Sequence, residues 1–315
     1  MVAYFKRENN LFMIIGAVLG FAAVLAYYGG RILGTEDQFV RLAMLSGGTF
    51  LGLIFSRILS AGYANRKLRE MYQKLYVETK PQEFIDLFTP RLSRVPDNLA
   101  EYMDGRVRLS FAEEALGHFD RALELLADLR PEELKLHTLT ASSLVVNQRA
   151  GIFLLEKDTA AAAEQIEDLK ELRKMAEKRA ATLGANLAQC IRLGEARIRA
   201  AEGAMTAEDE TYLLEEIRLS TNVIHQKEMQ LALAEGYFLT ERPAEAETLL
   251  KEITAERAGL WTEEQADRYL AGERPAAVTC TEGSAKPEAA EASGTQELTE
   301  RGDGDHGQKA EHAEQ

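Results

Sequence analysis

The chain has 315 residues and a formal net charge of −14, from 51 acidic and 37 basic side chains. This length leaves room for one or two domains. The acidic balance argues against a general nucleic-acid-binding protein, which would carry a basic face. Cys190 and Cys280 are the only cysteines, and they lie too far apart for a disulfide framework or a CxxC zinc site.

The first feature in chain order is an uncharged apolar run from Leu11 to Tyr28. Since a membrane-spanning helix needs roughly 20 residues, we expect a first span over about residues 11–33. A cleaved signal peptide is the alternative, because basic residues precede the run and the tripeptide at 24–26 resembles a cleavage site. The run continues past that tripeptide and a second apolar segment follows closely, which favours a retained helix.

The second apolar segment extends from Leu42 to Phe55, between Arg41 and Arg57. It reaches spanning length over about residues 39–59 if both arginines extend their side chains outward. An interfacial or core helix is the alternative. Together the two segments predict a transmembrane hairpin over residues 11–60.

Basic residues indicate how this hairpin is oriented. They cluster before the first span and after the second, and fewer lie in the connecting loop. The positive-inside rule therefore predicts that both termini lie in the cytoplasm, with residues 1–10 as a cytoplasmic N-terminus. We expect the membrane to be the inner membrane of a bacterium. The basic stretch after the second span would also contact anionic lipid. It contains Arg57, Arg66, Lys67, Arg69 and Lys74.

Each predicted span contains two glycines four residues apart, Gly16 with Gly20 and Gly48 with Gly52. Such pairs lie on one helix face and allow two backbones to approach closely. We expect them to pack one span against the other, and a homodimer through the same glycines is the alternative. The spans have no ionisable residue away from their ends, which argues against a channel or transporter.

Residues 61–96 form a basic juxtamembrane segment whose pattern is typical of an amphipathic helix followed by a linker. Leu68, Met71 and Leu75 recur at helical spacing, so the second span should continue into the cytoplasm as one helix. Pro81 should end it.

Three stretches of residues 97–271 share a pattern in which a small residue and an aromatic precede a turn, and an alanine and large apolar residues follow. They are LGHFDRALELLADLRP from Leu116, in which Gly117, Phe119 and Ala122 stand at helical spacing, NQRAGIFLLEKDTAAAAEQIEDL from Asn147 and LALAEGYFLTERPAEAETLLKEI from Leu231. This pattern resembles the tetratricopeptide repeat. The resemblance implies a solenoid of helical hairpins over residues 97–271, and an irregular helical bundle is the alternative. Both are all-α.

The match to this family is partial. Ala122, Ala162 and Ala246 lie one and then two steps of roughly 40 residues apart, which exceeds the 34-residue repeat of the family. Residues 184–220 keep helical periodicity without the signature. In such repeats the first helices of the pairs line a concave groove that takes a peptide or a helix. Carried onto the better-matched hairpins, the inward positions are Arg108, Phe111, Asn147, Gln148, Glu235 and Phe238.

The tail over residues 272–315 is acidic and almost without large apolar residues. Such a segment buries too little surface to offset the conformational entropy of ordering, so we expect it to be disordered.

No catalytic motif is present: the sequence has no P-loop, HExxH or GxSxG. Glu114 and His118 form an i,i+4 pair that we interpret as solvated helix charges. Arg192, Arg197 and Arg199 form a local basic patch, and Trp261 should cap the C-terminal hairpin. We therefore expect no enzyme, no cofactor and no metal.

These features together predict a membrane-anchored helical-repeat adaptor or scaffold that binds a protein partner at the cytoplasmic face of the membrane. One alternative is a non-catalytic regulatory or substrate-presenting subunit of a membrane enzyme complex. Another is an extracytoplasmic envelope scaffold, if the topology is inverted.

Overall fold

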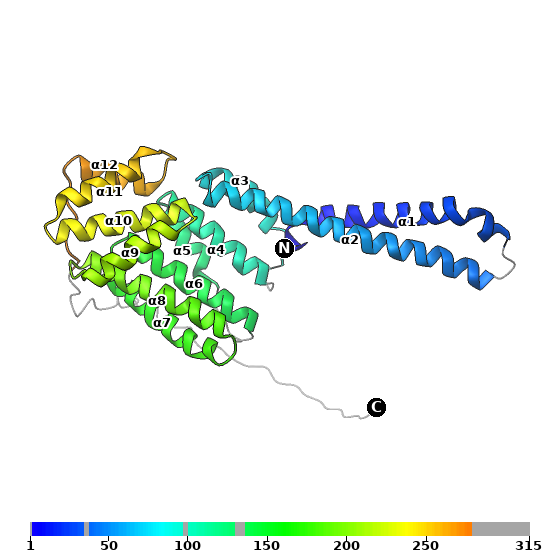
Figure 1. The fold of residues 1–315 in the computed structure, drawn as a ribbon, viewed down its shortest axis with the longest axis horizontal. Coiled ribbons are helices and arrows are strands. Elements are labelled where there is room, and N and C mark those ends of the chain that lie inside the picture. The colour runs from blue at the N-terminus through cyan, green and yellow to red at the C-terminus, as the bar shows by residue number, and fades with distance from the viewer. Residues whose placement is uncertain (1, 35–37, 97–99, 130–135, 279–315) are drawn as a thin grey trace, which may run out of the picture. The chain divides into compact units, whose positions relative to one another are not determined.

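The computed structural model describes residues 2–34, 38–96, 100–129 and 136–278. Within these ranges every regular element is a helix, so the expected all-α class is confirmed (Figure 1). Most of the predicted disordered tail, residues 279–315, lies outside them. In chain order the elements are η1 (Val2–Phe5), α1 (Lys6–Gly34), α2 (Gln38–Tyr76), α3 (Pro81–Leu92), α4 (Ala100–Ala115), α5 (Phe119–Ala127), α6 (Leu136–Leu155), α7 (Thr159–Glu177), α8 (Ala181–Ala201), α9 (Ala207–Leu219), α10 (Val223–Leu239), α11 (Pro243–Ala255) and α12 (Trp261–Leu270).

Prolines and polar caps begin several of these helices. Pro81 and Pro243 stand in the first turn of α3 and α11, where a missing amide hydrogen costs nothing. At the start of α9 the Thr206 hydroxyl accepts from the Asp209 amide at 3.2 Å, and the Asp209 carboxylate accepts from the Thr206 amide at 3.0 Å. At the start of α10 the Asn222 side chain accepts from the amides of Ile224 and His225.

The helices α1 and α2 lie side by side (Figure 1). Of the helices described, only α2 is long and apolar enough to cross a membrane; 6% of its most apolar window is buried. The part of α1 that qualifies as apolar, Asn10–Ala26, is shorter than a span. Large apolar side chains are exposed on both helices, among them Ile14 and Val18 on α1 and Phe50 and Phe55 on α2.

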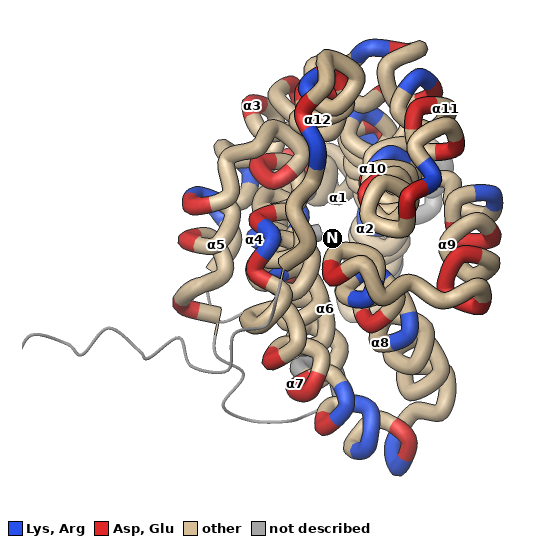
Figure 2. The backbone as a smooth tube through the Cα atoms, turned by 90° about the vertical axis from the view of Figure 1, so that its left-hand side faces the viewer, with Lys and Arg blue, Asp and Glu red and all other residues tan. Residues whose placement is uncertain are grey.

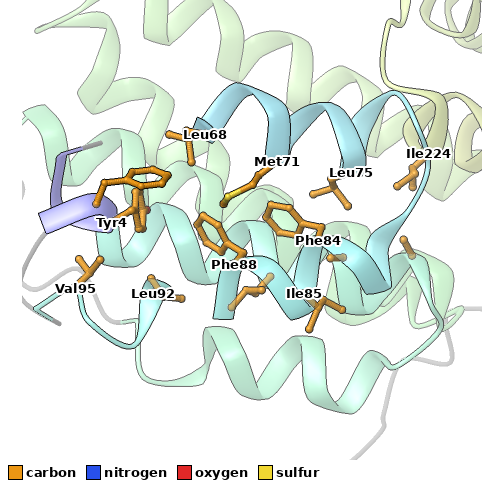
Figure 3. Close-up of a cluster of buried hydrophobic side chains, with 14 of the residues drawn as sticks. Tyr4, Leu68, Met71, Leu75, Phe84, Ile85, Phe88, Leu92, Val95 and Ile224 are labelled. Atoms are coloured by element: carbon orange, nitrogen blue, oxygen red, sulfur yellow. The ribbon is translucent and has the colours of Figure 1, made fainter. Parts of the chain in front are cut away.

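The C-terminal half of α2 enters a hydrophobic core instead. Leu68, Met71 and Leu75 are buried there against α3 (Figure 3). On α3, the rings of Phe84 and Phe88 stack with centroids 4.9 Å apart, and both are fully buried. One continuous helix therefore carries an exposed apolar surface at one end and core side chains at the other.

After α3 the helices pack in pairs. The even-numbered helices α4, α6, α8 and α10 contact one another in succession, and α5, α7, α9 and α11 each contact the even-numbered helix before them. Helix α10 is buried on several sides and carries charged residues such as Lys227, Glu228 and Glu235 among its buried positions. The even-numbered helices thus form an inner layer.

The last helices contact the first pair. Ile224 of α10 and Leu260, just before α12, belong to the same hydrophobic cluster as Leu109 and Ala112 of α4. The ring of Trp261 meets the ring of Phe119 with centroids 5.1 Å apart. Trp261 also packs against the C-terminal cluster that it was expected to cap. The sequence did not reveal that it joins this end to α5.

The turn between α4 and α5 corrects two expectations. The repeat pattern placed Gly117 at helical spacing, but α4 ends at Ala115 and Gly117 adopts a φ of +79°, which favours glycine. His118 consequently leaves the helix face of Glu114. Its Nδ1 lies 2.8 Å from Oε2 of Glu113 instead.

Candidate functional site

A cavity of about 80 Å³ lies among the four helices of the inner layer. Each helix contributes polar side chains to its lining: Glu114 from α4, Asn147 and Gln148 from α6, Arg197 from α8, and His225 and Glu228 from α10. Asn147 is exposed and His225 is half-buried, while the other four are buried. The cavity is therefore an interior site in which polar groups stand beside apolar side chains such as Leu154 and Ile166, with an accessible rim at Asn147.

Glu114 and Gln148 form a buried hydrogen bond in which the Gln148 amide donates to the Glu114 carboxyl. Burial raises the pKa of Glu114 well above its ordinary value, and the carboxylate of Glu228 raises it further. The guanidinium of Arg197 opposes this shift only in part. The Glu114 carboxyl is accordingly neutral at pH values where an exposed glutamate is ionised.

Arg197 and Glu228 bring opposite charges into the same interior. They are 7% and 4% exposed. Within the described part of the chain, Arg197 Nε and Glu228 Oε1 are buried atoms without a hydrogen-bond partner. His225 also lies beside Glu228, with its Nδ1 3.6 Å from Glu228 Oε2. Unpaired buried polar atoms are uncommon in native proteins, so this pair marks the cavity as unusual.

A smaller space of about 10 Å³ adjoins the first, and Arg197 and Glu228 line both. Glu235 also lines this smaller space, where it is buried and forms an ion pair with Lys157. The Tyr269 hydroxyl donates to the other oxygen of Glu235 at 2.8 Å. Both oxygens of Glu235 are therefore engaged, unlike those of Glu228.

Four of the six predicted inward residues come together at these two spaces. Phe111, Asn147 and Gln148 line the cavity, and Glu235 lines the adjoining space.

The other two predicted residues, Arg108 and Phe238, line neither space. Arg108 binds Asp104 at 2.9 Å and 3.0 Å and stacks over Tyr72 of α2, 4.2 Å from the ring centroid. Phe238 meets the ring of Tyr269 at 6.1 Å, with Arg274 over its face. These two side chains hold helices together at other places.

Sequence reasoning missed Arg197 and Glu228 as members of the site, and its interpretation of Glu114 as a solvated helix charge is wrong, because Glu114 is buried. The helical register of Arg197 and Glu228 carried a signal. Arg197 falls on the same stripe as Cys190 and Gly194, and Glu228 falls between Ile224 and Leu231 at helical spacing. A charged residue inside an apolar stripe points inward.

The predicted basic patch is wrong as a single surface. Arg199 binds the Asp209 carboxylate at 2.6 Å and 2.9 Å, and Arg192 binds Glu208 at 2.9 Å. Arg197 is turned inward. Acidic and basic positions are mixed over the helices rather than separated (Figure 2).

The predicted glycine pairs face one another across the contact of α1 with α2. A Cβ on Gly20 would lie 2.5 Å from the Gly48 carbonyl oxygen, and a Cβ on Gly16 would lie 2.7 Å from the Gly52 carbonyl oxygen. The Ser56 hydroxyl donates to the carbonyl of Phe12 beside them. An apolar groove of about 500 Å³ runs along this contact.

Among the residues with described positions, no three His, Cys, Asp or Glu side chains gather in a way that could hold a metal ion. No protein-family model, curated protein or solved structure matches this chain.

Proposed function

We propose that the chain is a membrane-anchored helical-repeat adaptor that binds a protein partner on the inner layer of its helical pairs, without catalysis. The observation that carries the proposal is the continuity of α2. Its exposed apolar part is suited to lipid, and its C-terminal part lies in the core that α3 and α4 share. A rigid helix of this kind would hold the partner at a fixed distance from the membrane.

In this proposal both α1 and α2 span the bilayer. The apolar part of α1, Asn10–Ala26, is shorter than the ~30 Å of a hydrocarbon core, and the uncharged residues 27–30 that follow it in the same helix would complete the span. Exposed apolar side chains such as Leu19 and Leu51 would contact lipid, where their exposure carries no free-energy cost. The basic residues that flank the hairpin favour a cytoplasmic location of both termini.

The resemblance to tetratricopeptide repeats supports the binding role. The successive contacts of α4, α6, α8 and α10 match the inner layer of such an array, which commonly holds peptides. Phe111 and Asn147 lie at the rim of the cavity, where a partner can reach them. The cavity is too small for a helix, so the partner would lie across the rim and insert a side chain.

A photo-cross-linking experiment tests this function. A photoreactive amino acid replaces Asn147 at the rim or, as a control, exposed Glu215 on α9, in the full chain in native membranes. We expect one adduct of defined mass from position 147 and none from position 215. Equal adducts from both positions, or none from position 147, would refute binding on the inner layer.

A further inference from the structure

The inner cavity has a charge balance that selects its occupant. Arg197 supplies one positive charge and Glu228 one negative charge, and each is more than nine-tenths buried. Burial and the neighbouring Glu228 raise the pKa of Glu114, which favours its neutral carboxyl, and half-buried His225 also lines the cavity. A bound cation or anion would therefore add an uncompensated charge to a buried site, which is unfavourable.

The two unpartnered atoms require complementary contacts. Arg197 Nε has a hydrogen to donate and Glu228 Oε1 is an acceptor, and neither has a partner within the described ranges. One neutral group that both accepts and donates would satisfy them together. Leaving them unpaired costs their desolvation, so such a group would be bound favourably.

The size of the cavity limits this group. A water molecule takes up about 30 Å³ of liquid, so 80 Å³ holds a few non-hydrogen atoms. Gly151 and Gly194 line the cavity, where a Cβ on Gly151 would lie 3.4 Å from Glu114 Oε1 and the Ile166 side chain fills the space beside Gly194. Of the residues that line it, Asn147 is exposed and His225 is half-buried.

We propose that this cavity binds a primary carboxamide, presented as an Asn or Gln side chain of the protein partner. Its oxygen accepts from Arg197 Nε and its NH₂ group donates to Glu228 Oε1. The inference deepens the adaptor function and rests on it, since the partner supplies the side chain.

Propionamide is a probe that tests the ligand class without the partner. The full chain is labelled with ¹⁵N-arginine, held in lipid nanodiscs and observed by NMR. The Nε–H signal that disappears in the variant Arg197→Lys is assigned to Arg197. We expect propionamide to shift this signal saturably, and equal concentrations of propionate or propylammonium to leave it in place. Glu228→Gln should weaken the binding at least tenfold, whereas Glu215→Gln on exposed α9 should not change it.

Three results would overturn the proposal. The first two are a saturable shift of the Arg197 signal by propionate and a saturable shift by propylammonium. The third is a signal that exchanges with water but does not respond to propionamide, which would mean that ordered waters alone fill the cavity. The ligand series on the unaltered chain decides this even if a variant does not fold. Saturable propionamide binding without a cross-link at position 147 would refute the adaptor function and leave the ligand class standing.

Discussion

The indole of Trp261 occupies the space beside Gly117, so that a Cβ on Gly117 would lie 2.5 Å from Trp261 Cδ1. These residues are far apart in sequence, and their contact joins the start of α12 to the turn between α4 and α5. The close approach needs glycine for two reasons: its missing side chain and its φ of +79°.

Gly117→Ala should therefore destabilise the chain by about 2–4 kcal/mol, from backbone strain and from overpacking against the indole. Urea unfolding of the full chain in detergent measures this. Gly259→Ala is a matched control, because Gly259 has a φ of +74° and a Cβ added to it would meet nothing within 4 Å. Gly259→Ala should be destabilised by backbone strain alone, by about 1–2 kcal/mol. Equal losses in the two variants would contradict the contact.

A buried ion pair holds α10 to the start of α12. Lys227 Nζ lies 2.5 Å from Glu263 Oε1, and both side chains are buried. Lys227→Met should cost about 3–5 kcal/mol, because it leaves the Glu263 carboxylate buried without its cation. Thermal unfolding measures the loss. Lys251→Met, at an exposed lysine 4.0 Å from Glu247, should change stability by less than about 0.5 kcal/mol.

The acid side of the stability profile should depend on Asp209. Hydrogen bonds from the Arg199 guanidinium hold the pKa of Asp209 well below its ordinary value, with help from Thr206. A lowered pKa in the folded state adds stability above the ordinary range of aspartate, near pH 4, and this stability is lost as the pH falls further. In the variant Asp209→Asn, the free energy of unfolding should therefore decline less steeply between about pH 4 and pH 2 than in the unaltered chain. Asp168→Asn, on exposed α7 surface, should leave the decline unchanged.

Glu114 should make the folded protein less stable as the pH rises, the opposite of the effect of Asp209. Its pKa is raised in the folded protein by burial and by Glu228, so its stabilising contribution is full below the ordinary glutamate range. It is lost as the pH rises toward the folded-state pKa, by up to about 1.4 kcal/mol per pH unit. Melting temperatures at pH 5, 6.5 and 8 should therefore fall more steeply for the unaltered chain than for Glu114→Gln. Parallel curves would show that Glu114 is not buried as described.

The contact between α1 and α2 makes its own prediction. A side chain on Gly20 would meet the Gly48 carbonyl oxygen at 2.5 Å, whereas Gly47 has nothing within 4 Å of such a position. Gly20→Val should lower stability in detergent by about 1–3 kcal/mol through overpacking. Gly47→Val should have little effect. A large loss for Gly47→Val would place the helix contact on another face.

The helices themselves could be predicted from the sequence because their signals are local. Leu68, Met71 and Leu75 recur at helical spacing, and this spacing alone indicated that α2 continues beyond its apolar part. The predicted inward positions Asn147 and Gln148 lie at the cavity because they follow the register of α6. Local periodicity is enough for such statements.

The contact between Trp261 and Gly117 and the gathering of charged side chains at the cavity could not be predicted in this way. Nothing near Trp261 in the sequence indicates that it meets Gly117, because the contact forms only when four helical pairs have stacked. Arg108 was placed inward by the repeat pattern, but Asp104 and Tyr72 hold it toward α2. Competing partners of this kind appear only in three dimensions.

The central claim is that one helix, α2, is embedded in the membrane at one end and reaches the cytoplasm at the other. Cysteine labelling along α2 tests this most directly, in a full chain with Cys190 and Cys280 replaced by serine. We expect a membrane-impermeant maleimide to label Arg69→Cys only after cell lysis, and Phe50→Cys only after detergent. Labelling of Phe50→Cys in lysed cells at the rate of Arg69→Cys would contradict the membrane anchor, and labelling of Arg69→Cys in intact cells would contradict the cytoplasmic orientation.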